Sequence, residues 1–589
     1  SVYLGTLSEG SDLDEAWNVS LQGTARKSNF VLDGLDVRLN ARYAFERQDS
    51  WGVSAGGNTL AVPGLLTLNN VTVVSSPSSS RTSVRAMGIL GGVAFDYKGK
   101  YIVDALFRRD GSSLFGAAER WHPYYRASLA WRLSDEGWWG LSGVVNDLKL
   151  RASVGTAGGR PGFTYQYETF TIGTGGTVTS NQLGNRFLKP ENTTETEFGL
   201  DAELYRKYGL NVTYSRSITD DIMLQVPVSS SSGFSSQWRN AGAIENRTWE
   251  ASLNVPVVTS ATATWVWRFS YDRNRAYLTK LNVPEFTRTT DGSRFEFRAG
   301  ERLGNVYGTY FVRDCGDLPA QFAASCGGPG SQFQRNDEGY IVWTGGYLPT
   351  EGITRNLWQA VLPGCLVNGV PVNQTGEVNC RAAGGVVNNP WAIPALHWGM
   401  LIVLRDSTAN KVFRKLGNTE PDFRLSWSQN FNWKRLTVYA LVDGSYGNKL
   451  FNEEVHWSLG DFMVRYEDQE GKNLGNAKPL GYYWRATSPD NGAGVGGYYD
   501  VLGVNNHTFE KGAYTKLREV SVSYAFGPIR GVGDWSLSVV GRNLWTITDF
   551  LGWDPETGGG VLNSSAIGAV AAYQYPQTRT FTVTLQTRF

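Results

Sequence analysis

Hydrophobic and polar residues alternate along most of this chain with a period of two. In residues 35–45 one side carries only apolar residues and the other is mostly polar. The apolar side is Leu35, Val37, Leu39, Ala41, Tyr43 and Phe45, and the other is Asp36, Arg38, Asn40, Arg42 and Ala44. Residues 265–272, 423–431 and 581–589 repeat the pattern. Because successive side chains of a strand point to opposite faces, each segment is predicted to be a two-faced strand.

The alternation predicts about fifteen clear strands, joined alternately by short and long connections. Tight turns are expected near Lys98, Lys207, Thr259 and Trp433. The predicted strands are 14–26, 34–47, 82–96, 101–110, 124–133, 147–156, 194–205, 209–225, 247–257, 262–274, 423–433, 435–445, 514–526, 535–547 and 577–589. The long polar loops are 48–80, 111–123, 157–193, 227–246, 275–420, 446–512 and 548–576. Short turns on one side and long loops on the other are typical of an outer-membrane barrel.

The fold class predicted is therefore all-β, a transmembrane antiparallel up-and-down barrel with long extracellular loops and short periplasmic turns. Hydrocarbon offers no partner to an open strand edge, so the strands are expected to close. Segment 275–420 is expected to add an even number of strands, for example around Arg302–Val312. Bacterial barrels have an even number of strands, so the odd count predicts that the chain begins inside the barrel sequence.

Composition agrees with a sheet protein and excludes some partners. Aromatic residues make up 13% of the chain, Gly numbers 69 and Met only 4. The 55 basic residues are balanced by 54 acidic ones, which gives no basic surplus for a nucleic acid. No run of 18 apolar residues predicts a transmembrane helix, and no N-terminal signal peptide is visible. Aromatic residues near strand ends fit a membrane girdle, with ordinary core packing as the alternative; they are Trp121, Tyr124, Tyr125, Trp131, Trp138, Trp139, Trp535 and Trp545.

The four cysteines lie in one polar segment and fit no CxxC metal site. We expect two loop disulfides in an oxidising compartment, Cys315–Cys326 and Cys365–Cys380, although three pairings are open and free thiols are the alternative. The histidines, at positions 122, 397, 456 and 507, share no metal-ligand spacing. No nucleophile stands with an orienting base, so we expect no enzyme, no cofactor and no metal.

Four segments in order carry a family resemblance. They are KYIVDALFRRDGSSLFG at 100–116 with RWHP at 120–123 and ASLAWR at 127–132; LKLRASVG at 148–155; ETEFGLD at 195–201 with NAGAIEN at 240–246; and YTKLREVSVSY at 514–524 with GRNLWT at 541–546 and WDPE at 553–556. Together they resemble the SusC/RagA-type TonB-dependent outer-membrane transporters. Their plain structural interpretation is that they hold register and loops, with Arg542 and Glu519 as a packed polar pair.

The resemblance implies that residues 1–589 form the C-terminal part of a 22-stranded barrel in the bacterial outer membrane. It further implies a signal peptide, an N-terminal domain, a TonB box and a plug that are absent from this sequence. A family member imports nutrients, here oligosaccharides or peptides, with a SusD-type surface lipoprotein as lid and with TonB acting through the N-terminal part. The terminal Phe589 resembles the barrel assembly signal. The alternatives are a passive porin-like pore and a soluble all-β carbohydrate-binding surface protein.

The long loops contain the candidate substrate-binding residues. Aromatic faces stack on sugar rings and amides satisfy hydroxyl groups, so aromatic, amide-rich loops suit sugars. Loop packing and contact with the lid are the alternative roles. The candidates are Tyr165, Tyr167, Phe170, Trp391, Trp398, Tyr482, Tyr483 and Trp484.

Overall fold

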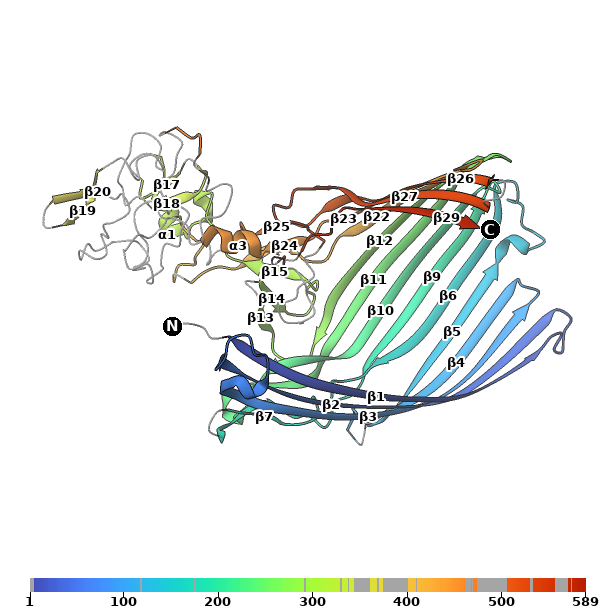
Figure 1. Cartoon of the computed structure of the whole chain (residues 1–589), viewed down its shortest axis with the longest axis horizontal. Helices are drawn as coiled ribbons and strands as arrows, with labels where there is room; N and C mark the ends of the chain where they lie inside the picture. Colours follow the sequence, from blue (N-terminus) through green and yellow to red (C-terminus); the bar gives the residue numbers. More distant parts are fainter. Residues whose placement is uncertain are drawn as a thin grey trace. The chain divides into compact units, whose positions relative to one another are not determined.

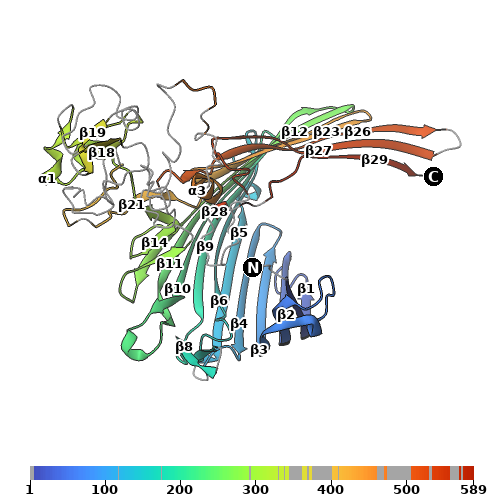
Figure 2. The ribbon, with the colours of Figure 1, turned by 60° about the vertical axis from the view of Figure 1, so that its left-hand side comes forward.

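A computed structural model of the chain shows long antiparallel strands and a set of small outer sheets (Figures 1 and 2). It describes residues 5–116, 119–173, 176–290, 293–328, 331–336, 338–343, 361–367, 370–373, 401–408, 410–460, 468, 470–473, 506–529, 533–556, 570–571, 573 and 575–588. Two compact units divide the chain. The first comprises Ser1–Thr259, Val266–Glu285 and Arg298–Arg302, and the second comprises Ser260–Trp265, Phe286–Phe297 and Leu303–Phe589.

The first unit is one up-and-down antiparallel ladder in which each long strand pairs with the next. Strand β6 pairs directly with β9, because β7 and β8 form a hairpin inside the long connection between them. Side by side in Figure 1 run β4, β5, β6, β9 and β10. The strands are β1 (Thr6–Lys27), β2 (Leu35–Leu60), β3 (Val71–Tyr97), β4 (Tyr101–Ser112), β5 (Trp121–Arg132), β6 (Val145–Gly159), β7 (Thr169–Ile172), β8 (Val178–Leu183), β9 (Glu191–Leu204), β10 (Tyr208–Pro227), β11 (Ser236–Thr259) and most of β12 (Ala263–Leu281). Short 3-10 turns η1 (Leu68–Asn70), η3 (Leu133–Asp135) and η5 (Ser230–Ser232) lie in the connections.

The second unit contains a second antiparallel ladder, β22–β23–β26–β27–β29, and several small sheets. Its long strands are β22 (Phe423–Trp433), β23 (Leu436–Tyr446), β26 (Tyr514–Ile529), β27 (Gly533–Thr548) and β29 (Thr580–Arg588). Its short elements are β13 (Phe286–Thr290), β14 (Ser293–Phe297), β15 (Asn305–Gly308), η6 (Cys315–Asp317), α1 (Ala320–Ala323), β16 (Cys326–Gly327), β17 (Phe333–Arg335), β18 (Ile341–Trp343), β19 (Val361–Val367), β20 (Val370–Asn373), β21 (Arg414–Asn418), β24 (Lys449–Asn452), α3 (Glu453–Gly460), β25 (Phe509–Lys511) and β28 (Val570–Ala571).

The two faces of the first ladder differ in chemistry as the alternation predicts. On β9 and β10, Phe198 lies opposite Tyr214 on the apolar face. On the other face Arg151 binds Glu197 at 3.1 Å and Asp201 at 3.1 Å. Apolar side chains such as Phe198, at 57% exposed, are left open on one face while ion pairs line the other. This is the pattern of a barrel wall with lipid outside and water inside.

Within the described ranges, no helix is both long and apolar enough to span a bilayer.

Several boundaries differ from the sequence prediction. The expected loop 48–80 is largely strand, because β2 runs to Leu60 and β3 starts at Val71. Likewise β11 starts at Ser236, inside the expected loop 227–246. These extensions are rich in Gly, Ser, Thr and Asn and do not alternate, since both faces lie beyond the lipid. These segments are strands because their backbone groups form hydrogen bonds with the neighbouring strand, and residue type alone does not predict that pairing.

The expected barrel strand around Arg302–Val312 is wrong. That segment contributes only β15, Asn305–Gly308, which pairs with β14 and β21 in a small separate sheet. All four residues of β15 are buried, and Val306 packs with Phe295, Phe451 and Phe509. A strand buried on both faces suits the core of an outer-loop domain rather than a wall between lipid and water.

The tight turns carry aromatic rings with lysines beside them. Lys98 lies 5.3 Å from the Tyr97 ring centroid, and Lys207 lies 5.3 Å from that of Tyr208. Trp131 stacks with Tyr101, with ring centroids 6.3 Å apart. Tyr124, also expected in the girdle, is placed otherwise. It lies opposite Arg108 on the polar face, because it is one residue out of phase with Tyr125.

A carboxylate fixes the longer turn between β5 and β6. Glu136 accepts hydrogen bonds from the Tyr101 hydroxyl at 2.6 Å and the Trp131 indole at 2.9 Å, and it pairs with Lys100 at 2.7 Å. The hydrogen bonds from Lys100 and Tyr101 lower the pKa of Glu136 to about 2. The turn is therefore held in place by an anion with three donors.

This arrangement predicts a pH dependence. The pKa of Glu136 is lower in the folded chain than its ordinary value of 4.5, so its contribution is present above that value. It is lost as pH falls from about 4.5 toward 2. Thermal melts between pH 7 and pH 2.5 should show a steeper loss for the native chain than for Glu136→Gln. Parallel melting curves for the two proteins would contradict the expectation.

Candidate functional site

Two outer-loop structures are candidates for binding, one in each unit. The first surrounds the β7–β8 hairpin. Tyr165 stacks face to face on Trp238 of β11, with ring centroids 3.7 Å apart and planes 10° apart. The Trp238 indole donates to Gln182 of β8 at 3.0 Å. Gln182, only 7% exposed, donates to the carbonyl of Thr164 at 3.0 Å. These bonds fasten the hairpin to the end of the wall.

The three expected binding residues in this loop therefore divide into two kinds. One face of Tyr165 is covered by Trp238, and burial raises the pKa of its hydroxyl. Its role is to support the loop. Tyr167 and Phe170 remain open, at 46% and 52% exposed. Phe170 touches Phe234 at 5.9 Å between centroids. Residue type at positions 165–170 does not distinguish a residue that supports the loop from one that is exposed for binding. The distinction depends on Trp238, which lies 73 residues after Tyr165 in the sequence.

The second structure is a strap, residues 549–556, that follows β27. Its first half is held by two carboxylates: half-buried Glu510 of β25 accepts a hydrogen bond from the Leu551 amide at 2.8 Å, and buried Glu454 of α3 accepts one from the Trp553 amide at 3.2 Å. Burial raises the pKa of both carboxyl groups. Between these anchors, Phe550 is buried at 6% exposure with Leu450 and Ala571.

The second half of the strap is held by ion pairs. Lys516 of β26, only 2% exposed, binds Asp554 at 2.7 Å and Glu556 at 2.8 Å. Arg518, two residues further along the strand, donates to both Glu556 and Asp443 of β23. We call Asp443, Lys516, Arg518, Asp554 and Glu556 the ionic cluster. It joins the YTKLR and WDPE segments, whose pairing explains why both belong to one sequence signature.

The backbone of the strap is held by Glu510 and Glu454, and two of its apolar side chains are exposed to solvent. Leu551 is 68% exposed and Trp553 is 63% exposed. Neither was among the expected binding residues. The WDPE segment is predicted from the sequence to have a structural role. The exposure of the Trp553 side chain follows only from the direction in which the strap is anchored.

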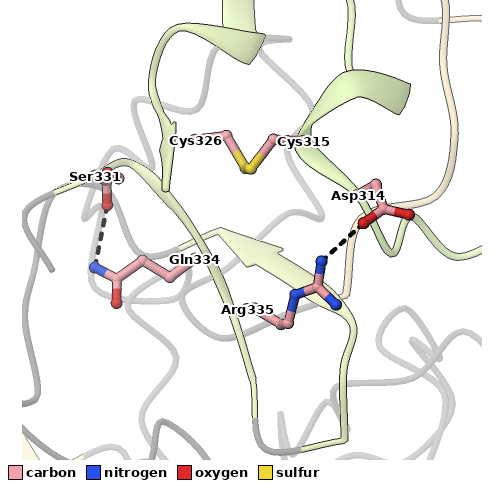
Figure 3. Close-up of a disulfide and its surroundings, with 6 residues drawn as sticks. All are labelled: Asp314, Cys315, Cys326, Ser331, Gln334 and Arg335. Atoms are coloured by element: carbon pink, nitrogen blue, oxygen red, sulfur yellow. Dashed lines mark hydrogen bonds and ion pairs between the residues drawn. A yellow bond between two sulfur atoms is a disulfide. The ribbon is translucent and has the colours of Figure 1, made fainter. Parts of the chain in front are cut away.

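The remaining expected residues fall as follows. Cys315 and Cys326 are joined in a disulfide, S–S 2.02 Å, which closes the segment around α1 (Figure 3). Beside it Arg335 pairs with Asp314 at 2.8 Å, and Gln334 donates to the Ser331 carbonyl. Arg542 and Glu519 form the predicted pair at 2.8 Å. Trp391, Trp398, Tyr482, Tyr483, Trp484, Cys380, Phe589 and the Cys365 side chain lie outside the described residues.

Acidic residues and histidines in the described part of the chain form no group of three or more that could hold a metal. The two outer-loop structures expose aromatic and apolar side chains to solvent.

Comparison with known proteins decides the family. The family described as "TonB dependent receptor-like, beta-barrel" matches residues 3–350, more than half of the chain. The chain belongs to this family. The TonB-dependent receptor barrel is an outer-membrane structure, and the family comprises receptors and transporters rather than a class of enzymes.

Named relatives agree with the family. A TonB-dependent receptor of Formosa agariphila is 25% identical over 519 residues, which cover 84% of this chain and 45% of the relative. The TonB-dependent receptor SusC of Bacteroides thetaiotaomicron is 28% identical over 228 residues, 36% of this chain and 22% of SusC. The similarity to SusC agrees with the SusC/RagA resemblance of the four sequence segments in this TonB-dependent receptor. The chain spans about half the length of the curated relatives that it matches over most of its own length.

Among solved structures, the RagAB peptide transporter is similar, with a TM-score of 0.67 and 17% identity over 98% of this chain and 56% of that one. The same importer in its open-open state gives a TM-score of 0.66 and 18% identity, with 99% and 55% covered. At this identity the likeness concerns the fold. It agrees with the antiparallel wall, the long outer connections and the short turns of this receptor.

Proposed function

We propose that this chain forms the wall and outer-loop part of a TonB-dependent nutrient importer. The substrate class is oligosaccharides or peptides, a SusD-type lipoprotein covers the outer loops, and TonB supplies the energy through a part of the protein beyond this chain. Family membership supports the coarse role. The similarity to SusC and to the RagAB peptide transporter supports the choice of partner and substrate class.

One observation carries the proposal. At the long-loop end of the first unit, Tyr167 and Phe170 are open to solvent while Tyr165, Trp238 and Gln182 hold the loop beneath them. Rigid aromatic side chains bind with little loss of conformational entropy. Below them, the polar face carries charged and amide groups such as Arg151, which suits the passage of a hydrophilic substrate rather than an apolar one.

Binding to the purified full chain tests the proposal. Calorimetric titration with a set of neutral oligosaccharides and with a set of short peptides should give saturable binding to one set. Tyr167→Ala with Phe170→Ala should weaken it about thirtyfold, because each of the two lost aromatic contacts contributes on the order of 1 kcal/mol. Phe187→Ala, which removes a side chain that is 82% exposed in the same connection, is the matched control.

Three outcomes decide the proposal. An equal loss in the Phe187 variant would show that the loop has unfolded rather than lost a contact. Binding of neither ligand set would reject the substrate class. Ion conductance in planar bilayers without any saturable binding would favour a passive pore.

A further inference from the structure

The apolar face of the first unit ends, at its long-loop end, in arginines that lie opposite one another. On β10 the outward residues run Leu210, Val212, Tyr214 and then Arg216. On the neighbouring strand Trp249 lies opposite Tyr214, and Arg247 lies opposite Arg216. Side chains directly opposite in an antiparallel ladder point to the same face. Both guanidinium groups therefore lie on the lipid-facing side, one step beyond an aromatic pair with ring centroids 4.7 Å apart.

The same change from apolar to arginine occurs elsewhere in the unit. On β2 and β3, Phe45 lies opposite Met87, and the next outward pair is Arg47 opposite Arg85. On β4, Arg109 follows Phe107 on the same face and lies 5.7 Å from the Trp121 ring centroid. The repetition across separate strand pairs shows that the arginines belong to a level on the wall rather than to one local contact.

Strand geometry places that level at the outer membrane interface. The nine residues from Tyr208, beside the short turn and Lys207, to Arg216 span about 26 Å along the strand, at roughly 3.3 Å for each of the eight steps. A tilted barrel strand crosses the hydrocarbon with about 9–11 residues. Tyr208 therefore marks the inner boundary and Arg216 the outer one. The arginine level faces the headgroups of the outer leaflet.

The charges at this level leave a net positive site. Arg216 binds Glu245 at 2.8 Å, and Arg247 binds the other oxygen of the same carboxylate. Glu245 is 7% exposed on its side chain, whereas Arg216 and Arg247 are 47% and 56% exposed. One buried anion thus orients two exposed guanidinium groups, which together carry one uncompensated positive charge. Glu245 offsets only part of the repulsion between two arginines that lie directly opposite, and an anion above them would offset the rest.

We propose that the Arg216–Glu245–Arg247 trio binds a phosphate group of the phosphorylated glycolipid in the outer leaflet. A guanidinium pairs with phosphate through two parallel hydrogen bonds, which suits a fixed and planar donor set. The acyl chains of the same lipid would continue over Tyr214 and Trp249, the lipid-facing surface already described. The site concerns anchorage of the wall in its leaflet and is independent of the transported substrate.

The test uses the purified full chain in lipid nanodiscs and lipid A as the probe. Native mass spectrometry follows binding of lipid A with two, one or no phosphate groups. Affinity should rise with the number of phosphates. Arg216→Gln with Arg247→Gln should weaken binding of the two-phosphate form about tenfold, because each basic residue near the surface contributes a several-fold effect. Inorganic phosphate at the same concentration should not compete.

Two further variants separate binding from structure. Glu245→Gln removes the competing negative charge while the amide oxygen can still accept a hydrogen bond from a guanidinium group, so lipid A should bind at least as tightly. A merely structural trio would instead lose stability with no gain in binding. Lys98→Gln with Lys207→Gln removes the same charge at the short-turn end and should leave binding unchanged. If the glutamine pair does not insert into membranes, Arg216→Lys with Arg247→Lys replaces it and should bind less tightly than the native chain.

Equal binding of all three lipid A forms would overturn the proposal. So would an equal loss in the Lys98 and Lys207 control, or a Glu245→Gln protein that loses lipid A together with stability.

Discussion

Replacing Lys516 by methionine is expected to lower the free energy of unfolding of the second unit by about 3–5 kcal/mol, because it removes one partner of a buried ion pair. Lys516 is almost fully buried and is held between Asp554 and Glu556. Methionine fills a similar volume but leaves both carboxylates without this cation. Arg518 still pairs with Glu556, so Asp554, at 7% exposure, bears most of the loss.

Lys511 provides the matched control. It pairs with Asp549 at 3.4 Å, but the two side chains are 68% and 79% exposed. Lys511→Met should therefore change stability by less than about 1 kcal/mol. Urea unfolding in lipid–detergent micelles, followed by tryptophan fluorescence, measures both variants. Similar midpoints for the two would show that the ionic cluster does not hold the strap.

Replacing Gly242 by alanine is expected to cost about 1–3 kcal/mol or more through a backbone collision. A Cβ at this position of β11 would lie 2.0 Å from the carbonyl oxygen of Lys280 on β12. The strands meet closely here, since the Asn282 amide donates to the Ala241 carbonyl at 2.6 Å. The collision can be relieved only if β11 and β12 move apart, because the atoms nearest the added methyl belong to the backbone and not to a flexible side chain.

Gly91→Ala is the control for this substitution. Its Cβ on β3 would meet no atom within 4 Å, so stability should stay within about 0.5 kcal/mol of the native chain. Heat-modified gel migration reports whether the wall has formed, and urea midpoints give the size of the change. A Gly242→Ala protein as stable as Gly91→Ala would mean that the two strands are free to move apart at this point.

The sequence predicts the wall better than the loops, for a physical reason. Strand 423–433 was predicted with the bounds that β22 has, because lipid on one side and water on the other impose alternation on every residue. Arg542 with Glu519 was also within reach, since a tight hairpin between two alternating strands nearly fixes their register. Beyond the membrane that constraint ends, which is why the alternation predicts a loop where the outer parts of β2 and β3 lie.

The candidate sites depend on contacts between distant residues. The sequence predicts Tyr165 as a binding residue, but in the structure Trp238 covers one face of its ring. Trp553 is not among the predicted binding residues, yet its side chain is exposed on the strap. Neither outcome follows from local pattern. The signatures predicted that the YTKLR and WDPE segments matter, but only the structure shows that they pair through Lys516 and Arg518.

The separation of the ionic cluster along the chain has a consequence for how the protein is assembled. Asp554 comes 38 residues after Lys516, and the hairpin of β26 and β27 lies between them. The lysine can meet its carboxylates only once that hairpin has closed. The strap can therefore dock on β26 only after β26 and β27 have paired, so the ionic cluster is completed late in the folding of this unit.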